Sequence, residues 1–121
     1  MSETYFFDTY ALFEIIRGNP KYEKYTDSKA ITTAFNIAEL NYNLKKLHSK
    51  KIADFFTKKF KQCTVRILWD DIINAMDLKI QYKDLSIPDV VGYIVAKRSK
   101  VKFLTGDEGF KSFENVEFVK K

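Results

Sequence analysis

The stretch LSIPDVVGYIVAKRSKVKFLTGDEGF, residues 85–110, contains a helix, a strand and an acidic turn in succession. Pro88 and Asp89 open an apolar helix, because proline is tolerated in the first turn and an acid is favoured there. The segment VKFLT at 101–105 is typical of a buried strand, and Asp107 follows it by two residues. A helix that leads directly into a buried strand indicates an α/β fold with helical crossovers between parallel strands.

Strands and helices are expected to alternate along the rest of the chain. We expect strands at 4–7, 30–33, 64–68, 101–105 and 116–119, and helices at 9–18, 34–50, 49–61, 70–83 and 88–100. Strands separated by helix-length connections favour a parallel sheet with helices on both faces. The predicted fold is therefore α/β, with a five-stranded, mainly parallel sheet of order 3-2-1-4-5, in one domain over residues 1–121.

Composition and charge narrow the functional classes. The chain has 121 residues, of which 45% are hydrophobic, which suits one well-packed core. The formal charge of +5 favours a polyanionic partner such as nucleic acid. Cys63 is the single cysteine, so an internal disulfide is excluded. The first residues do not resemble a signal peptide and no apolar run is long enough to span a bilayer, so we expect a cytoplasmic protein with no membrane partner.

Four acids are predicted to meet at one edge of this sheet. Asp8 ends the first strand, and Asp107 follows the fourth. In a sheet of this order those two strands are neighbours that flank the switch point where ligands bind. Asp89 starts the helix that precedes the fourth strand, and Glu39 lies about two turns into the helix after the second. The four carboxylates should therefore converge on one crevice.

Each acid also has a structural explanation. Ser86 and Asp89 match the spacing of a capping box, and Asp8 could cap the helix that begins at Thr9. Asp107 suits the turn GDEG, and Glu39 could lie on an exposed helix face. The case for a site depends on the joint arrangement of the four acids.

A divalent cation would explain such a cluster. Neighbouring carboxylates repel one another, and a hard cation neutralises them. Mg2+ or Mn2+ is the expected cofactor, because every candidate ligand is an oxygen and the only histidine, His48, lies elsewhere.

The segments YFFDTYAL, ITTAFNIAELNYNL, LSIPDVVGYIVA and FLTGDEGF, in this order, resemble PIN-domain ribonucleases. Length and motif order resemble the VapC toxins of prokaryotic toxin–antitoxin pairs, over residues 4 to about 119. The resemblance implies a metal-dependent endoribonuclease that cleaves RNA phosphodiesters with metal-activated water and leaves a 5′-phosphate. It also implies a cognate antitoxin and a homodimer. By motif, the catalytic and metal-binding residues would be Asp8, Glu39, Asp89 and Asp107, supported by Thr9, Thr105 and Glu108.

Basic residues in the middle of the chain are weaker candidates for RNA binding. They lie on the helices after Glu39, interleaved with phenylalanines, which suits phosphate contacts combined with base stacking. Core phenylalanines and solvated lysines would give the same pattern, so that explanation stays open. The candidates are Lys45, Lys46, Lys50, Lys51, Lys58 and Lys59.

Other functions compete with the toxin interpretation. A housekeeping RNA-processing nuclease and a catalytically inactive PIN scaffold would share the fold, although four retained acids argue against the scaffold. A receiver-like signalling domain also gathers acids at strand ends. It needs paired acids after the first strand, whereas Asp8 stands alone there and Asp70 and Asp71 lie at a helix start. A short domain without an appended module favours the toxin.

Overall fold

The computed structural model describes residues 3–121, which form an α/β fold around a parallel sheet. The sheet has the order β2-β1-β3-β4. Its strands are β1 (Thr4–Phe7), β2 (Lys29–Ile31), β3 (Lys102–Thr105) and β4 (Val116–Phe118). In the register, Phe6 of β1 lies opposite Ile31 of β2 on one side and Phe103 of β3 on the other. The fold class and the parallel arrangement predicted from the sequence are confirmed.

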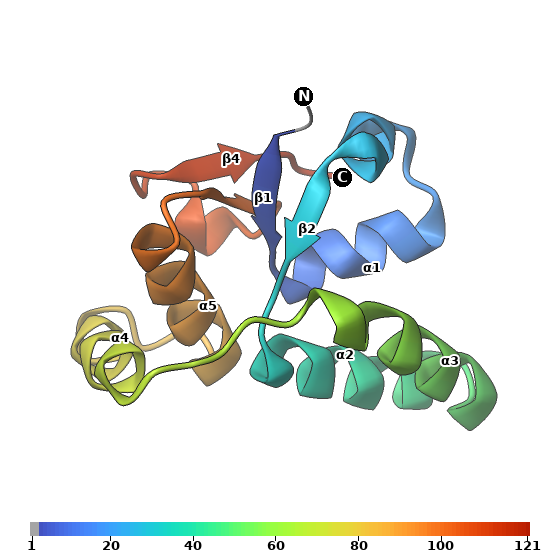
Figure 1. Ribbon diagram of the computed structural model, residues 1–121, viewed down its shortest axis with the longest axis horizontal. Helices are drawn as coiled ribbons and strands as arrows, with labels where there is room; N and C mark the ends of the chain where they lie inside the picture. The colour runs from blue at the N-terminus through green and yellow to red at the C-terminus, as the bar shows by residue number, and fades with distance from the viewer. Residues whose placement is uncertain (1–2) are drawn as a thin grey trace.

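The helices cover both faces of this sheet. They are α1 (Thr9–Arg17), α2 (Ala34–Leu47), α3 (Lys50–Phe60), α4 (Trp69–Gln81) and α5 (Ile87–Arg98), with 3-10 turns η1 (Pro20–Asp27), η2 (Lys61–Cys63) and η3 (Glu108–Phe110). Figure 1 shows β1 and β2 running toward α1 and α2, with the pairs α2–α3 and α4–α5 each packed together. Within residues 3–121, no helix is long and apolar enough to cross a membrane.

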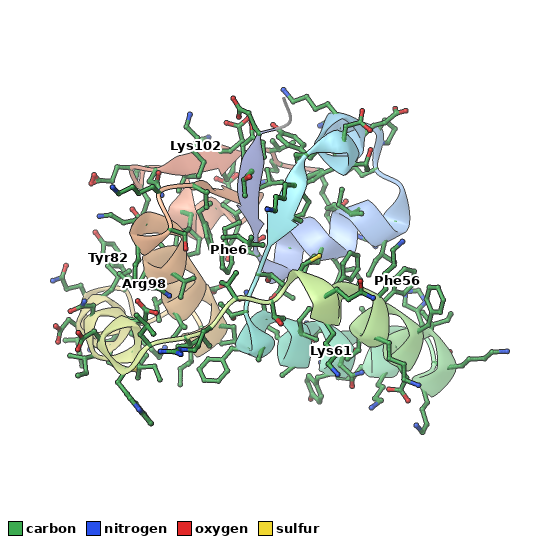
Figure 2. All side chains as sticks on the ribbon, in the orientation of Figure 1. Phe6, Phe56, Lys61, Tyr82, Arg98 and Lys102 are labelled. Carbon is green, nitrogen blue, oxygen red and sulfur yellow. The ribbon has the colours of Figure 1, made fainter. Side chains whose placement is uncertain are left out.

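Alternating side chains of the central strands build a separate core on each face. Phe6, labelled in Figure 2, and Phe103 point into a cluster with α5, where their rings stack with centroids 5.5 Å apart. Phe7 and Leu104 point the other way, into a cluster with α1, η1 and α2. Both faces are buried, which explains why these strands are continuous apolar runs in the sequence. The sheet, packed on both faces, therefore supports the residues that follow the carboxyl ends of β1 and β3, which include Asp8 and Asp107.

The predicted strand at 64–68 is wrong. Only Thr64 makes an isolated parallel bridge, to Thr32, and the segment after it is irregular. Val65 N–H still donates to the carbonyl of Thr32 at 2.9 Å, but the pairing ends there. Farther along, backbone groups bond to side chains: the Arg66 carbonyl accepts from Arg98 at 3.0 Å, and Leu68 N–H donates to Asp71 at 2.8 Å. The sheet therefore has four strands instead of five.

The strand was predicted there because apolar and polar residues alternate along 64–68, a pattern that does not require pairing with a neighbouring strand. Val65 and Ile67 pack against the α5 side of the core, as alternate residues of a strand would. β2 ends at Ile31, so little strand remains to pair with.

Candidate active site

Asp8 is fixed at the junction of β1 and α1. It is the N-cap of α1 and its Oδ1 accepts a hydrogen bond of 2.8 Å from Ala11 N–H. Its backbone N–H donates to the carbonyl of Leu104 in β3, which joins it to the neighbouring strand. The side chain is almost fully buried, with 1% exposure of the residue. A capping role and a place at the switch point of the sheet therefore coincide in one residue.

Asp89 and Asp107 are held in the same way. Asp89 and Ser86 form the capping box of α5, in which Ser86 N–H donates to Asp89 Oδ2 at 2.9 Å. Asp107 caps η3, and its Oδ1 accepts from Gly109 N–H at 2.9 Å. The capping explanation is thus correct for Asp8, Asp89 and Asp107, and the caps of Asp89 and Asp107 each leave the second carboxylate oxygen available. Helix capping and ligand binding are compatible here.

The four predicted acids line a single pocket of about 340 Å³. Glu39 reaches it from the middle of α2 and is half-buried. The pocket lies at the edge of the sheet where β1 and β3 end, which is the position predicted for the crevice. Ser86, predicted as the capping partner of Asp89, also lines the pocket. The sequence did not single out the other residues along its walls, which are Tyr10, Phe13, Glu14, Asn43 and Lys121, and it left Arg17 without a role.

The carboxylates share the pocket without forming a closed cage. Among residues 3–121, no three acidic, cysteine or histidine side chains are grouped closely enough to hold a metal ion as they stand. An all-protein cage is not what Mg2+ requires, because Mg2+ usually keeps several waters and binds one or two carboxylates together with substrate phosphates. The all-oxygen donor set fits Mg2+ or Mn2+ for the same reason.

The protonation of the acids reflects burial and mutual repulsion. Burial raises the pKa of Asp8 well above its usual range, and the charges of Asp89 and Asp107 raise it further, against hydrogen bonds from Thr105 and Ala11. Burial also raises the pKa of Asp89 to about 6; the Ser86 N–H opposes this, and the charges of Glu39 and Asp107 add to it. A cation in the pocket would relieve this repulsion.

A buried polar network lies beside the acids, and the sequence analysis missed it. The Asn36 side chain is fully buried and connects the N-terminal turns of α1 and α2. Its Nδ2 donates to Thr9 Oγ1 at 3.3 Å, and its Oδ1 accepts from Thr33 Oγ1 at 2.7 Å. The available signal was the spacing Thr33–Asn36–Leu40, which puts an amide on the apolar stripe of a helix.

The supporting residues implied by resemblance fall into two groups. Thr105 is fully buried, and its Oγ1 accepts from Asp107 N–H at 3.0 Å. Thr9 is buried beside Asp8 and bonds to Asn36. Glu108 is exposed, does not line the pocket, and forms an ion pair of 2.6 Å with Lys120.

The predicted RNA-binding lysines do not line this pocket. Lys45 and Lys50 pair with Asp54 at 3.3 and 2.6 Å, and Lys46 lies over the Tyr42 ring. Figure 2 shows Phe56 and Lys61 on the α3 side, where Phe56 packs against the second core. These lysines therefore do not share the pocket with the four acids.

The arrangement agrees with a comparison against protein families, in which residues 5–116 match the PIN domain. This chain belongs to the PIN domain family. PIN domains are generally nucleases that use divalent metals. The receiver-like alternative is therefore wrong. A search of curated protein sequences found no significant match.

Solved structures share the fold of this PIN domain at low sequence identity. One is titled a toxin–antitoxin complex from Klebsiella pneumoniae, with a TM-score of 0.74 and 18% identity over 96% of this chain and 98% of that one. Another is the protein PAE2754 from Pyrobaculum aerophilum, with a TM-score of 0.70 and 17% identity over 98% of this chain and 92% of that one. At these identities the likeness establishes the fold alone.

Proposed function

We propose that this PIN domain is a divalent-metal-dependent endoribonuclease, and that residues 1–121 act as one catalytic unit. The observation that carries the proposal is the shared pocket, to which four carboxylates come from four different elements of the fold. In this proposal Asp8, Asp89 and Asp107 bind the ion, and Glu39 binds it or orients the attacking water.

Each acid has a distinct part in this proposal. A bound Mg2+ or Mn2+ would supply a positive charge for the phosphoryl oxygens and lower the pKa of water. Asp8 is the most buried of the four acids and caps α1, and in this proposal it fixes where the ion binds. Asp89 and Asp107 each offer the oxygen that does not cap a helix. Glu39 is less constrained, which suits a group that accepts a proton from water.

RNA cleavage by the purified chain tests this function. We expect cleavage with Mg2+ or Mn2+, none with EDTA, and at least about a 100-fold loss of rate in Asp89→Asn, because a lost ligand removes several kcal/mol of charge stabilisation. The amide oxygen introduced by this substitution can still accept from Ser86 N–H, so the helix cap should survive. Asp70→Asn, an exposed acid in the first turn of α4, is the matched control and should retain full activity. Cleavage that survives EDTA and Asp89→Asn alike would contradict the proposal.

We further propose that the chain is the toxin of a VapBC-type pair that acts on RNA in the cytoplasm as a homodimer. This is supported by the match of residues 5–116 to the PIN domain and by the likeness in fold to a chain of a toxin–antitoxin complex. A cognate antitoxin would block the acidic pocket, for which a basic side chain is the complementary group. Expression should arrest bacterial growth, and co-expression of the protein encoded beside it should restore growth. Normal growth with active enzyme would favour an RNA-processing role instead.

A further inference from the structure

The pocket extends past the four acids along one face of α1. Tyr10, Phe13 and Arg17 recur at helical spacing on that face, and all three line the pocket. From Thr9 to Arg17 the helix rises about 12 Å, so at least one nucleotide fits between Arg17 and the acids. Asn43 of α2 lines the same pocket, one turn beyond Glu39. A strand of nucleic acid held at the acids could therefore continue between α1 and α2.

Arg17 is held in place by its own helix. Its Nη1 pairs with Glu14 at 3.3 Å, and its guanidinium lies 5.9 Å from the centre of the Phe13 ring. Glu14 is itself buried and also accepts from Asn19 Nδ2 at 2.8 Å, so the anchor is fixed from two sides. Within residues 3–121 the guanidinium makes no other hydrogen bond, which leaves most of its five donors for a ligand.

The chemistry of this face matches single-stranded RNA. A guanidinium binds phosphate through paired hydrogen bonds, and a half-buried aromatic ring offers a stacking surface for a base. Bases are free to stack on side chains only where the RNA is not paired. Positive charge is also needed next to the acids, because the carboxylates alone would repel the phosphate backbone. Arg17 and Lys121 supply it inside the pocket, and Arg17 is the one on the α1 face, whereas the lysines of α2 and α3 lie outside the pocket.

We propose that the α1 face formed by Tyr10, Phe13 and Arg17 is the track that binds single-stranded RNA beside the cleaved phosphate. Arg17 binds a flanking phosphate, and Phe13 stacks on the base between that phosphate and the acids. The proposal rests on the proposed ribonuclease function, and it names the surface that recognises the substrate.

Steady-state cleavage of a labelled 12-nucleotide single-stranded RNA tests the track. Arg17→Gln should raise KM roughly tenfold with kcat unchanged, as expected when a charge-assisted bond is lost equally from substrate and transition state. Phe13→Leu should raise KM at least about fivefold through lost stacking. Arg66→Gln is the matched control, since Arg66 is an exposed arginine outside the pocket, and it should leave KM unchanged.

A second readout separates charge from stacking. Binding of the same RNA to the cleavage-defective Asp107→Asn protein can be followed by fluorescence anisotropy over a salt series. Arg17→Gln should reduce the slope of log affinity against log salt by about 0.7, the value for one phosphate contact on a single strand, and Phe13→Leu should not. Arg17→Lys retains the pairing with Glu14 and the charge, so it should keep the slope and the fold while KM rises less than in Arg17→Gln.

The outcomes distinguish the track from the function. The track alone would be overturned if the wild-type enzyme were active and the Arg17→Gln and Phe13→Leu variants had its KM and its salt dependence of binding. Equal losses with a duplex RNA of the same sequence would overturn its preference for single strands. Wild-type protein without metal-dependent cleavage would overturn the proposed function and the track with it.

Discussion

The side-chain amide of Asn36 joins α2 to α1 by a hydrogen bond of 3.3 Å to the hydroxyl of Thr9. Thr9 directly follows Asp8, and Asn36 lies one helical turn before Glu39, so the bond connects the backbones that carry two of the four acids. Gly92, one turn after Asp89 in α5, approaches the same amide so closely that an added Cβ would lie 3.2 Å from Asn36 Oδ1. The segments that carry three of the acids therefore meet at Asn36.

Removing this amide should weaken metal binding even in protein that is still folded, so a loss of stability alone would not explain the weaker binding. We expect Asn36→Ala to reduce Mn2+ affinity roughly tenfold, as is usual when a group that orients a ligand is lost. It should also destabilise the fold by about 1–3 kcal/mol, because Thr9 and Thr33 lose a buried partner. Isothermal titration of the folded protein with Mn2+ gives the affinity, and urea unfolding gives the stability.

Two further variants test whether the change in Mn2+ affinity comes from the Asn36–Thr9 hydrogen bond or from a general loss of stability. Val95→Ala removes buried methyl groups at the other end of α5 and should destabilise the fold without changing Mn2+ affinity. Thr9→Val removes the other end of the same bond, so its effect on affinity should not add to that of Asn36→Ala. Equal Mn2+ affinity in wild type and Asn36→Ala would mean that the amide only stabilises the fold.

Without metal, the buried acids should make the protein less stable as the pH rises. The pKa of Asp89 is about 6 in the folded chain against 3.8 for an ordinary aspartate, so the folded state binds the proton more tightly. Its contribution to stability is therefore complete below about pH 4 and is lost as the pH rises through about 6. Asp8 shifts in the same direction and deepens the loss.

Asp89→Asn should remove much of this dependence. In EDTA at pH 7 the variant should be more stable than wild type by about 2 kcal/mol, and at pH 4 the difference should disappear. Thermal unfolding across this pH range measures it, with Asp70→Asn as the exposed control. Saturating Mn2+ should stabilise wild type at pH 7 and not Asp89→Asn. A wild-type curve that rises with pH between 4 and 7 in EDTA would contradict the burial argument.

The sequence predicted that the four acids share one pocket because their positions follow from topology. Asp8 and Asp107 had to meet once β1 and β3 were neighbours, since parallel strands end at the same edge. Asp89 followed from the helix that leads into β3. These inferences needed only the order of the elements, and an error in one peripheral strand did not affect them.

The sequence could not predict interactions that depend on side-chain placement. Alternating Val65 and Ile67 suggested a strand, whereas β2 is short and the pairing beside it is limited to one bridge at Thr64. Arg17 was left unassigned, since only the folded helix shows that it shares a pocket with the acids. The lysines of α2 and α3 lie outside this pocket, and their part in RNA binding stays a prediction.

The Arg98–Asp71 pair should be important for the stability of the fold. Arg98 binds both oxygens of the buried Asp71 carboxylate, at 2.8 and 2.9 Å, where α4 and α5 pack together (Figure 2). Its charge and hydrogen bonds hold the pKa of Asp71 below the usual value in spite of the desolvation. Arg98→Met would leave a buried carboxylate unpaired, so we expect a loss of about 3 kcal/mol in urea unfolding. Arg66→Gln should cost less than about 0.5 kcal/mol, and equal losses in the two variants would contradict a specific role for the pair.

The last prediction separates two residues that the resemblance treats alike. The Thr105 hydroxyl lies between Asp8 and Asp107: it accepts from Asp107 N–H and donates toward Asp8. Thr105→Val keeps the shape of the side chain and removes both contacts, so Mn2+ affinity and cleavage rate should each fall roughly tenfold. Glu108→Gln only breaks an exposed ion pair with Lys120 and should change both by less than about twofold. If Glu108→Gln instead weakened Mn2+ binding as strongly as Thr105→Val, the carboxylate of Glu108 would have to turn from Lys120 into the pocket when the ion binds.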